Sequence, residues 1–500
     1  MGEDAPDRIR QVVIVGGGTA GWMAAAALVK HFVATDLRIT LVESSDIGTI
    51  GVGEATIPTI RRFYAKLGLT DQAVMEATSA TVKLGIQFKD WRRPGESFIH
   101  PFGLYGQNMG EVAFHHLWLR RRQQGDDTPL ERYSLGASLA EQGRMALPPR
   151  DASAPLAVYD WAIHLDASQF AQYLRRYAEA SGVTRIDAKV ADVERGPGGV
   201  AAIRLADGRR IEGELFIDCT GFRSMLLEAL GVGFEDWREW LPCDAAVAVQ
   251  TENAEGEPPA YTRAHAKPHG WQWRIPLRHR AGNGLVYASE AISEDAATAA
   301  LLADLPGKPL VEPRRIAFRS GRRTEAWRGN VVALGLAAGF LEPLESTSIA
   351  LIETGIERLK ELFPTRAFAP ALPAEFNDAT AREMERVRDF IILHYKLNRR
   401  DDSDFWRRCA AMPVPETLAR KLALWDARGE FLRYRWEMFH PSSWLAIYTG
   451  FDRMPAALNP ALSGLDMDQV GLALERMQRG VAQTVARTPT HAQFLQAMHA

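Results

Sequence analysis

The stretch QVVIVGGGTAGWMAAAALVKHF (residues 11–32) predicts a strand, a glycine turn and a helix in direct succession. The run from Val12 to Val15 is continuously apolar, which is typical of a parallel strand buried on both faces. The glycines that follow have the G-x-G-x-x-G spacing, at Gly16, Gly18 and Gly21. In such a turn, backbone N–H groups and the start of the helix can approach a pyrophosphate.

The next apolar run supplies the rest of this pattern. LRITLVES (37–44) predicts a second strand that reaches Glu43, 22 residues beyond Gly21. An acidic side chain at this point can accept a hydrogen bond from a ribose hydroxyl. The alternative is a tight structural turn that binds nothing, but strand, turn, helix, strand and acid in this order favour a Rossmann-like dinucleotide site. No second fingerprint follows, so we expect one dinucleotide, which need not be a nicotinamide.

The bulk properties narrow the class of protein. The chain has 500 residues, enough for two or three domains. A net charge of −3 gives no reason to expect nucleic acid or an anionic membrane as a partner. The polar N-terminus and the lack of a long apolar run predict neither a signal peptide nor a membrane span. Three widely spaced cysteines fit a reducing cytoplasm, and no Cys/His spacing indicates a metal site.

Further along, the chain alternates between strand and helix patterns. DASQFAQYLRRYAEASG (166–182) has a capped start and helical spacing. Strands are expected over 185–194 and 199–222, with a hairpin at Asp207-Gly208. Residues 329–363 predict a strand, a glycine turn and a long helix, a second junction that can face the same ligand. From about residue 366 a proline-rich connector, PTRAFAPALPAEF, leads into a mostly helical pattern.

Two short strings stand out between these elements. ATVKLGIQFKDW (80–91) places Lys83 in an alternating apolar strand, where a lone lysine is usually solvated on the outer face. GWQWRIP (270–276) places Trp271 and Trp273 on one face of an extended segment. Taken alone, two such indoles more often pack in a core than take part in chemistry.

Read together with Lys83, Glu345 and the dinucleotide turn, GWQWRIP resembles the flavin-dependent halogenases of the tryptophan halogenase family, whose mark is W-x-W-x-I-P. The resemblance continues through GVGEATIP (51–58), IHPFG (99–103), DCTGFRS (218–224), GFLEPLESTS (339–348) and SWLAIYTG (443–450). It implies an α/β fold in which an FAD-binding, Rossmann-like domain of the flavin monooxygenase type is interleaved with a substrate domain over residues 8–365. A mostly helical C-terminal part, 366–500, would complete the substrate site.

The resemblance also implies where the cofactor lies. FAD would follow the glycine turn, with the ribose at the end of the second strand and further contacts from three apolar residues. GVGEATIP would be the strap that links the flavin site to the substrate site. The residues that match the family's FAD contacts are Gly16, Gly18, Thr19, Ala20, Gly21, Glu43, Ser44, Val190, Leu336 and Ile349.

Family members take reduced FAD from a separate reductase and, with O2 and a halide (bromide or chloride), produce hypohalous acid. This oxidant would pass along a tunnel, walled by Trp271 and Trp273, to the lysine that matches Lys83. Free hypohalous acid reacts indiscriminately, so it must be held beside one carbon of the substrate to give one product. A desolvated lysine can hold it as a hydrogen-bond donor or as a nucleophile.

Glu345 matches the family's partner carboxylate, which can polarise the electrophile or take the proton of the ring intermediate. Its alternative role is to cap the helix that ESTS opens. Thr347 and Ser348 match the backbone amides that hold halide. Ser348 replaces the glycine of the common pattern, so its hydroxymethyl group would crowd or hydrogen-bond the anion and alter halide preference.

His100 and Phe102 match the positions that sandwich the substrate ring, and Phe439 lies near the family's stacking tryptophan. Their alternative is ordinary core packing. The tryptophan-specific members clamp the amino acid with a tyrosine pair and a glutamate, which residues 429–450 lack, and Tyr434 stands where that glutamate would be. Burying a zwitterion without partners costs several kcal/mol. An uncharged, indole-like ring should therefore fit better than tryptophan, unless the site stays open for a larger molecule.

Two other functions compete with a halogenase. A flavin monooxygenase that inserts oxygen directly would share the fold, but it needs its substrate against the flavin and has no use for a tunnel lysine. A non-catalytic FAD-binding sensor or assembly partner would need neither Lys83 nor Glu345. The sequence therefore favours a halogenase that acts on an aromatic, indole-like substrate.

Overall fold

The computed structural model describes residues 7–47, 54–148, 159–253 and 256–498. The chain forms two compact units, each built from three separate segments. The first unit comprises Met1–Ala80, Leu165–Leu241 and Ala317–Glu385, and the second comprises Thr81–His164, Pro242–Ile316 and Arg386–Ala500. The predicted division into residues 8–365 and 366–500 rests on sequence texture and stays a prediction.

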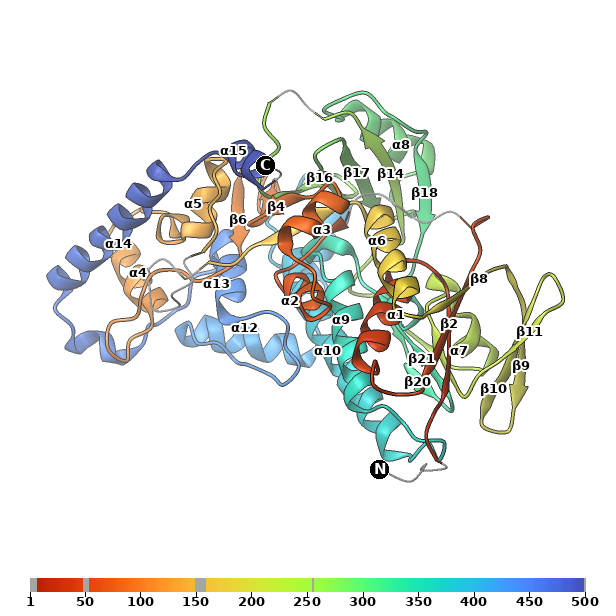
Figure 1. The fold of residues 1–500 in the computed structure, drawn as a ribbon. Coiled ribbons are helices and arrows are strands. Elements are labelled where there is room, and N and C mark those ends of the chain that lie inside the picture. Colours follow the sequence, from red (N-terminus) through yellow and green to blue (C-terminus); the bar gives the residue numbers. More distant parts are fainter. Residues whose placement is uncertain (1–6, 48–53, 149–158, 254–255, 499–500) are drawn as a thin grey trace. The chain divides into compact units, whose positions relative to one another are not determined.

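A six-stranded sheet forms the centre of the first unit, in the order β20-β21-β12-β1-β2-β8 (Figure 1). β1 runs parallel to both of its neighbours, and only β20 is antiparallel. Helix α1 (Thr19–His31) packs against α6 (Ala167–Ala180) and α9 (Ser348–Glu361). This parallel core confirms the predicted α/β, Rossmann-like fold. Its strands are β1 (Gln11–Val15), β2 (Arg38–Glu43), β8 (Thr184–Asp187), β12 (Leu215–Asp218), β20 (Trp327–Arg328) and β21 (Val331–Ala333).

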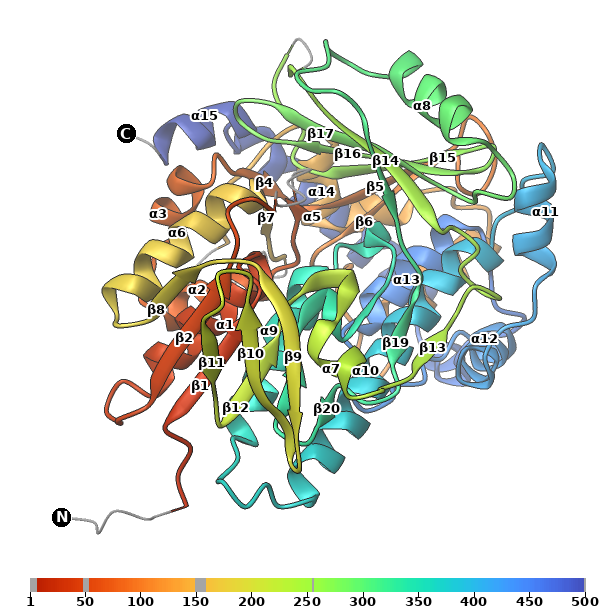
Figure 2. The same cartoon turned by 90° about the vertical axis from the view of Figure 1, so that its right-hand side faces the viewer.

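Local signals predicted several neighbouring elements correctly. The carboxylate of Asp166 accepts from the N–H groups of Ser168 and Gln169, which caps α6. Strands β10 and β11 pair antiparallel across the Asp207-Gly208 turn, and β9 completes a three-stranded sheet (Figure 2). β9 spans Val190–Gly196, β10 spans Gly199–Leu205 and β11 spans Arg210–Glu212.

The second unit is built on a seven-stranded sheet in the order β18-β14-β17-β16-β15-β5-β6. Neighbouring strands from β14 to β6 are antiparallel except β15 and β5. Helix α8 (Glu294–Ala303) packs on β14 and β17, where its apolar face closes a small core (Figure 2). The strands are β5 (Gly85–Lys89), β6 (Ser97–Pro101), β14 (Ala245–Thr251), β15 (Thr262–Lys267), β16 (Gly270–Pro276), β17 (Ala281–Tyr287) and β18 (Arg314–Ala317).

The single strand predicted around Lys83 is in fact two strands, so that prediction was wrong. β4 (Thr81–Lys83) pairs with β7 (Ala162–Leu165), whereas β5 belongs to the large sheet. The chain changes sheets at Leu84, whose N–H donates to the carbonyl of Ala260 at 2.7 Å and whose carbonyl accepts from Phe102 at 2.8 Å. These partners are distant in sequence, so the alternating pattern could not reveal the break.

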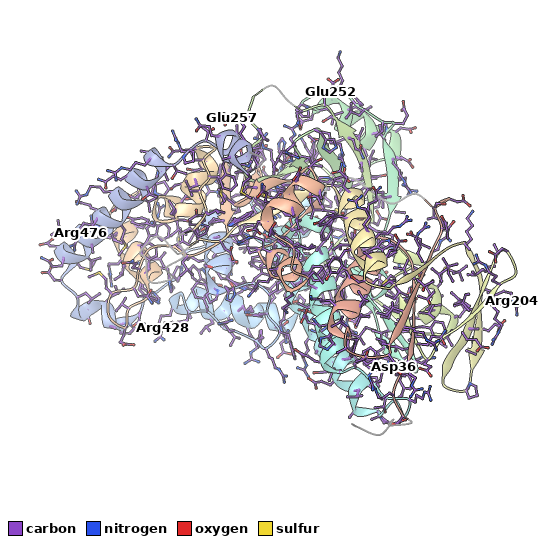
Figure 3. The ribbon with its side chains drawn as sticks, in the orientation of Figure 1. Asp36, Arg204, Glu252, Glu257, Arg428 and Arg476 are labelled. Carbon is purple, nitrogen blue, oxygen red and sulfur yellow. The ribbon has the colours of Figure 1, made fainter. Side chains whose placement is uncertain are left out.

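The C-terminal part is mostly helical, as predicted, but its first helix begins earlier than expected. α10 (Ala371–Lys396) starts inside the string predicted as a connector, so only residues before 371 form a linker. Arg428, at the end of α12, and Arg476, on α14, extend away from the ribbon (Figure 3). Within the described residues, no helix is both long and apolar enough to cross a membrane. The other helices are α11 (Asp404–Ala411), α12 (Glu416–Arg428), α13 (Pro441–Gly450), α14 (Met467–Arg487) and α15 (His491–Ala497).

Candidate active site

The glycine turn between β1 and α1 forms an open cradle in the first unit. Gly16 has a φ of +110°, and a Cβ there would collide with the carbonyl of Cys219. A Cβ at Gly21 would collide with the carbonyl of Gly16, which explains why the turn needs glycine at both points. At Gly18, in contrast, a Cβ would meet no atom of the described residues within 4 Å. This open position is where a ligand can approach the backbone.

The helix that follows begins at Thr19 and Ala20 without a side-chain cap. Its first N–H groups therefore keep their donor capacity for a ligand, and the helix dipole favours an anion there. Such an end suits the pyrophosphate of a dinucleotide.

Glu43 ends β2 beside this turn, with its carboxylate where a Cβ at Gly17 would be. Its Oε1 accepts from Arg185 Nε at 2.6 Å, an ion pair that the sequence did not reveal. A carboxylate has about four acceptor positions, so Glu43 can still accept from a ribose hydroxyl. Ser44 begins the turn after β2, and its Oγ accepts from the N–H of Asp46.

The second strand-to-helix junction lies against the first, as predicted. A Cβ at Gly335, in the turn that contains Leu336, would lie 3.0 Å from the Cβ of Ala20. Ile349 is buried in the first turn of α9, and Val190 opens β9. The open cradle, the uncapped helix and the acceptor carboxylate together fit FAD, although contacts of the individual residues with the flavin stay predictions.

The strap GVGEATIP is described only from Glu54 on, because residues 51–53 lie outside the described part of the chain. Burial raises the pKa of Glu54 to about 7.

Glu345 is buried, with 1% of its surface exposed, at the end of the short helix η4 (Pro343–Glu345). Ser346 follows in the left-handed region at φ +60°, and Thr347 is the N-cap of α9. Both roles of Glu345, as catalytic carboxylate and as cap of this helix, stay predictions. The side chain of Thr347 makes no cap hydrogen bond, and Ser348 is the first residue of α9, so an anion is favoured at the first N–H groups of this helix.

Lys83 is fully buried in the second unit, with 0% of its surface exposed. Its Nζ lies 5.1 Å from the centroid of the Phe102 ring, within the range of a cation–π contact. The alternative of a solvated lysine is therefore wrong. Burying an ammonium costs several kcal/mol before partners offset it, so this position favours a chemical role for Lys83.

A buried histidine fixes the strand that carries Lys83. The hydroxyl of Thr81 donates to the carbonyl of Pro276, at the end of GWQWRIP, at 2.6 Å. Thr81 has no second proton, so His164 Nδ1, 2.9 Å away, must donate to it. His164 Nε2 then accepts from the hydroxyl of Thr262 at 2.9 Å.

A second histidine holds the same strand from the C-terminal helix α15. His491 Nδ1 donates to the carbonyl of Pro258 at 2.8 Å, and its Nε2 accepts from the N–H of Val82 at 3.1 Å. Burial lowers the pKa of both His491 and His164, which keeps both rings neutral. Sequence reasoning missed both histidines, because neither lies in a motif and His491 follows Val82 by 409 residues.

The two tryptophans of β16 differ in their surroundings. Their ring centroids are 6.2 Å apart. Trp271 continues into an aromatic cluster through Trp91, 6.3 Å away, as core packing would have it. Trp273 covers Gly284 on the neighbouring strand, where any Cβ would collide with its indole. A role for this pair as a tunnel wall stays a prediction.

Aromatic side chains gather near the predicted substrate residues of the second unit. The ring of Phe439 stacks on that of Phe390, with centroids 3.9 Å apart. The ring centroid of His100 lies 5.9 Å from that of Phe390 and 6.5 Å from that of Phe439. Trp444 meets Phe390 edge-on at 5.0 Å. The structure thus brings together His100 and Phe439, as predicted, and adds Phe390, which lies in a helix with no motif.

Comparison with known proteins supports the family that the sequence resembles, over most of the chain. The family model described as tryptophan halogenase matches residues 11–467. The tryptophan 6-halogenase SttH of Streptomyces toxytricini is 38% identical, over 92% of each chain. Among solved structures, BrvH, a flavin-dependent halogenase from Brevundimonas sp. BAL3, is 62% identical with a TM-score of 0.95, over 99% of this chain and 100% of that one. Xcc4156, a flavin-dependent halogenase from Xanthomonas campestris, is 43% identical with a TM-score of 0.94, over 98% of each chain. The chain therefore belongs to the tryptophan halogenase family, whose members are flavin-dependent enzymes of the oxidoreductase class.

Proposed function

We propose that this enzyme uses FADH2, O2 and bromide or chloride to form hypohalous acid and delivers it to Lys83 for electrophilic halogenation of an aromatic, indole-like substrate. The observation that carries the proposal is the burial of Lys83 against the ring of Phe102, on a strand held by two neutral histidines. Burying the Lys83 ammonium lowers the stability of the folded protein. The best reason for that cost is that the ammonium holds the oxidant.

Each remaining residue has a role that its own surroundings support. Bound reduced flavin supplies the electrons that activate O2 for halide oxidation. The N–H groups of Thr347 and Ser348, at the uncapped start of α9, hold the halide. The buried carboxylate of Glu345 accepts the proton that the substrate ring loses.

The substrate ring lies in the second unit, among His100, Phe102 and Phe439. Trp271 and Trp273 wall the path of the oxidant and keep water from it. Reduced flavin comes from a separate reductase by diffusion. The three cysteines are all buried and form no disulfide among the described residues, which supports a cytoplasmic enzyme.

The test is to supply the protein with FAD, a reductase, air and bromide or chloride, and to analyse a panel of simple aromatics by mass spectrometry. We expect halogenated indole only when halide is present. A hydroxylated product that forms without halide would identify a flavin monooxygenase instead. Release of peroxide alone would favour a non-catalytic flavoprotein.

The choice of substrate is a prediction of its own. We expect kcat/KM to be higher for indole than for free tryptophan under the same halide, because a buried ammonium and carboxylate would both need partners. Turnover of either small probe should be slow, because the site binds them weakly. A clear advantage for tryptophan would show that the second unit contains an amino-acid clamp.

A further inference from the structure

Helix α10 carries three arginines, and only one of them has no carboxylate beside it. Arg382 pairs with Asp378 at 2.8 Å, and Arg388 pairs with Asp389 at 2.8 Å. Arg386 lies between them with 8% of its surface exposed. Its Nε and Nη1 are buried and have no hydrogen-bond partner among the described residues. A guanidinium keeps its charge in proteins, so its burial requires an acceptor.

The immediate neighbour of Arg386 is an aromatic ring. Its guanidinium carbon lies 4.4 Å from the ring centroid of Tyr434, the residue that replaces the clamp glutamate expected in tryptophan-specific relatives. Lys421 Nζ lies 5.0 Å from the same centroid. The ring faces attract both cations but supply no hydrogen bond, so Tyr434 positions the guanidinium and leaves its N–H groups available.

A carboxylate of this cluster, that of Glu437, forms an ion pair with Lys421, but neither of its oxygens has a hydrogen-bond partner among the described residues. Glu437 lies 2.5 Å from Lys421 Nζ, and both side chains are at least 96% buried. Lys421 also lies 4.3 Å from the ring centroid of Trp444, whose indole Nε1 is buried with no acceptor among the described residues. The cluster of Arg386, Lys421, Glu437 and Trp444 therefore has one excess positive charge, unused N–H donors on Arg386 and Trp444, and unused acceptor oxygens on Glu437.

This cluster adjoins the group of aromatic side chains formed by His100, Phe390, Phe439 and Trp444, which we call the aromatic slot. Arg386 and Phe390 are four residues apart on α10, so their side chains share one face of the helix, about one turn or roughly 5 Å apart along the axis. Phe390 stacks on Phe439, and Trp444 contacts Phe390 on one side and Lys421 on the other. A ring stacked at Phe439 could thus extend a tail of about two or three carbon atoms toward Arg386.

We propose that Arg386 and Trp444 form a carboxylate-binding subsite, and that the natural substrate class is an aromatic acid with an anionic tail. This proposal rests on the proposed function, because it specifies the substrate class of the same site. A guanidinium binds a carboxylate through two parallel hydrogen bonds, and the indole N–H offers a third donor.

The test measures equilibrium binding by calorimetry, with oxidised protein and no reductase, so that a failure of halogenation leaves it intact. The ligands are indole-3-propionate and its uncharged amide, which have nearly the same shape. We expect wild type to bind the acid about ten- to a hundredfold more tightly than the amide, as lost charged hydrogen bonds would predict. Arg386→Met should bind both equally, Arg386→Lys should retain part of the preference, and the control Arg382→Met should behave as wild type.

Thermal unfolding without ligand separates this role from a structural one. Removing an unpaired buried charge should leave the melting temperature of Arg386→Met unchanged or raised, whereas loss of a structural arginine would lower it. Equal affinity of wild type for acid and amide would overturn the proposal. So would an acid preference that survives in Arg386→Met, or a preference lost together with a clearly lowered melting temperature.

Discussion

Ser348 is the residue at which this chain departs most clearly from the family's halide pattern. It is the first residue of α9 and follows the left-handed Ser346 by two positions, so its hydroxymethyl group stands at the start of an uncapped helix. The backbone N–H that would hold the halide is kept, while the space around it is reduced. The residue therefore affects which anion fits rather than whether one binds.

We expect bromide to be preferred when bromide and chloride compete at equal concentrations, because bromide loses its hydration shell more easily and is easier to oxidise. Ser348→Gly should shift the ratio of products toward chlorination by relieving the crowding. The ratio of brominated to chlorinated indole is read directly by mass spectrometry. A wild-type mixture that is mainly chlorinated would contradict this reading of Ser348.

Single residues of this site were predictable where a motif marks them and hidden where it does not. The glycines of the turn, Lys83 and Glu345 each lie in a string with a recognisable neighbourhood. Arg386 differs from Arg382 and Arg388 only in lacking a carboxylate partner, which no one-dimensional pattern records.

At the scale of elements, the three-residue strand β4 is the critical piece. Its pairing with β7 is too short to position the Lys83 ammonium by itself. Hydrogen bonds with the two buried histidines, His164 and His491, position the strand further. Local signals such as the Asp166 cap and the Asp207-Gly208 turn predicted whole elements, because short-range geometry determines them. The break at Leu84 depends on Ala260 and Phe102, so only the folded chain reveals it.

We predict that His491→Leu weakens the coupling between oxidant and product. The N–H of Val82 would lose its acceptor in a buried place, at a cost of about 1–3 kcal/mol, and Lys83 would be less well positioned. Halogenated product per FADH2 consumed should fall, while hypohalous acid captured by a soluble trap should rise. His491→Gln keeps an acceptor near Val82 and should restore part of the coupling. Unchanged coupling in His491→Leu would remove the positioning role.

The same histidine predicts that the yield of halogenated product per FADH2 consumed, here called coupling, declines at acidic pH. Because burial lowers the pKa of His491 in the folded protein, its contribution to stability is fully present above its ordinary value of about 6.5 and is lost as pH falls through the lowered one. Glu257, His164 and Lys83 are the other charged or titratable groups of this neighbourhood. Coupling in wild type should therefore decline on acidification, and the decline should be weaker in His491→Gln, which cannot titrate.

At the scale of the whole molecule, buried carboxyl groups set the pH dependence of stability. Burial raises the pKa of Glu353, on α9, to about 8, although Arg62 and Lys66 lower it. The unfolded value is near 4.3, so the folded state binds this proton more tightly. Glu353 therefore stabilises the protein fully below about pH 4.3, and this contribution is lost as the pH rises through 8.

Glu353→Gln tests this, because glutamine has the same shape and does not ionise. The variant should match wild type in thermal unfolding near pH 4 and be more stable by up to about 5 kcal/mol near pH 9. Glu357→Gln is the control: Glu357 pairs with Lys66 at 3.0 Å and with Lys360 at 2.7 Å, so its loss should not stabilise at any pH. Parallel stability curves for wild type and Glu353→Gln would show that Glu353 stays ionised.

The assembly of the whole chain was only partly predictable. Within the parallel core of the first unit, β1, α1 and β2 follow from one contiguous stretch, 11–44, because these elements are close in sequence. The second unit gathers three segments that lie far apart, so strand order such as β15 beside β5 is decided by long-range packing. Its aromatic slot likewise joins His100 to Phe390 and Phe439, which lie 290 and 339 residues later (390 − 100 and 439 − 100).

The most direct test of the central claim is a single turnover of wild type and Lys83→Ala with FADH2, air, bromide and indole, followed by quantification of bromoindole and of trapped hypohalous acid. Lys89→Ala, in the next strand, is the matched control. We predict that Lys83→Ala binds FAD and forms hypohalous acid as wild type does, but releases more of it to the trap and forms no bromoindole, whereas Lys89→Ala forms bromoindole normally. Bromoindole at the wild-type rate from Lys83→Ala would contradict the account.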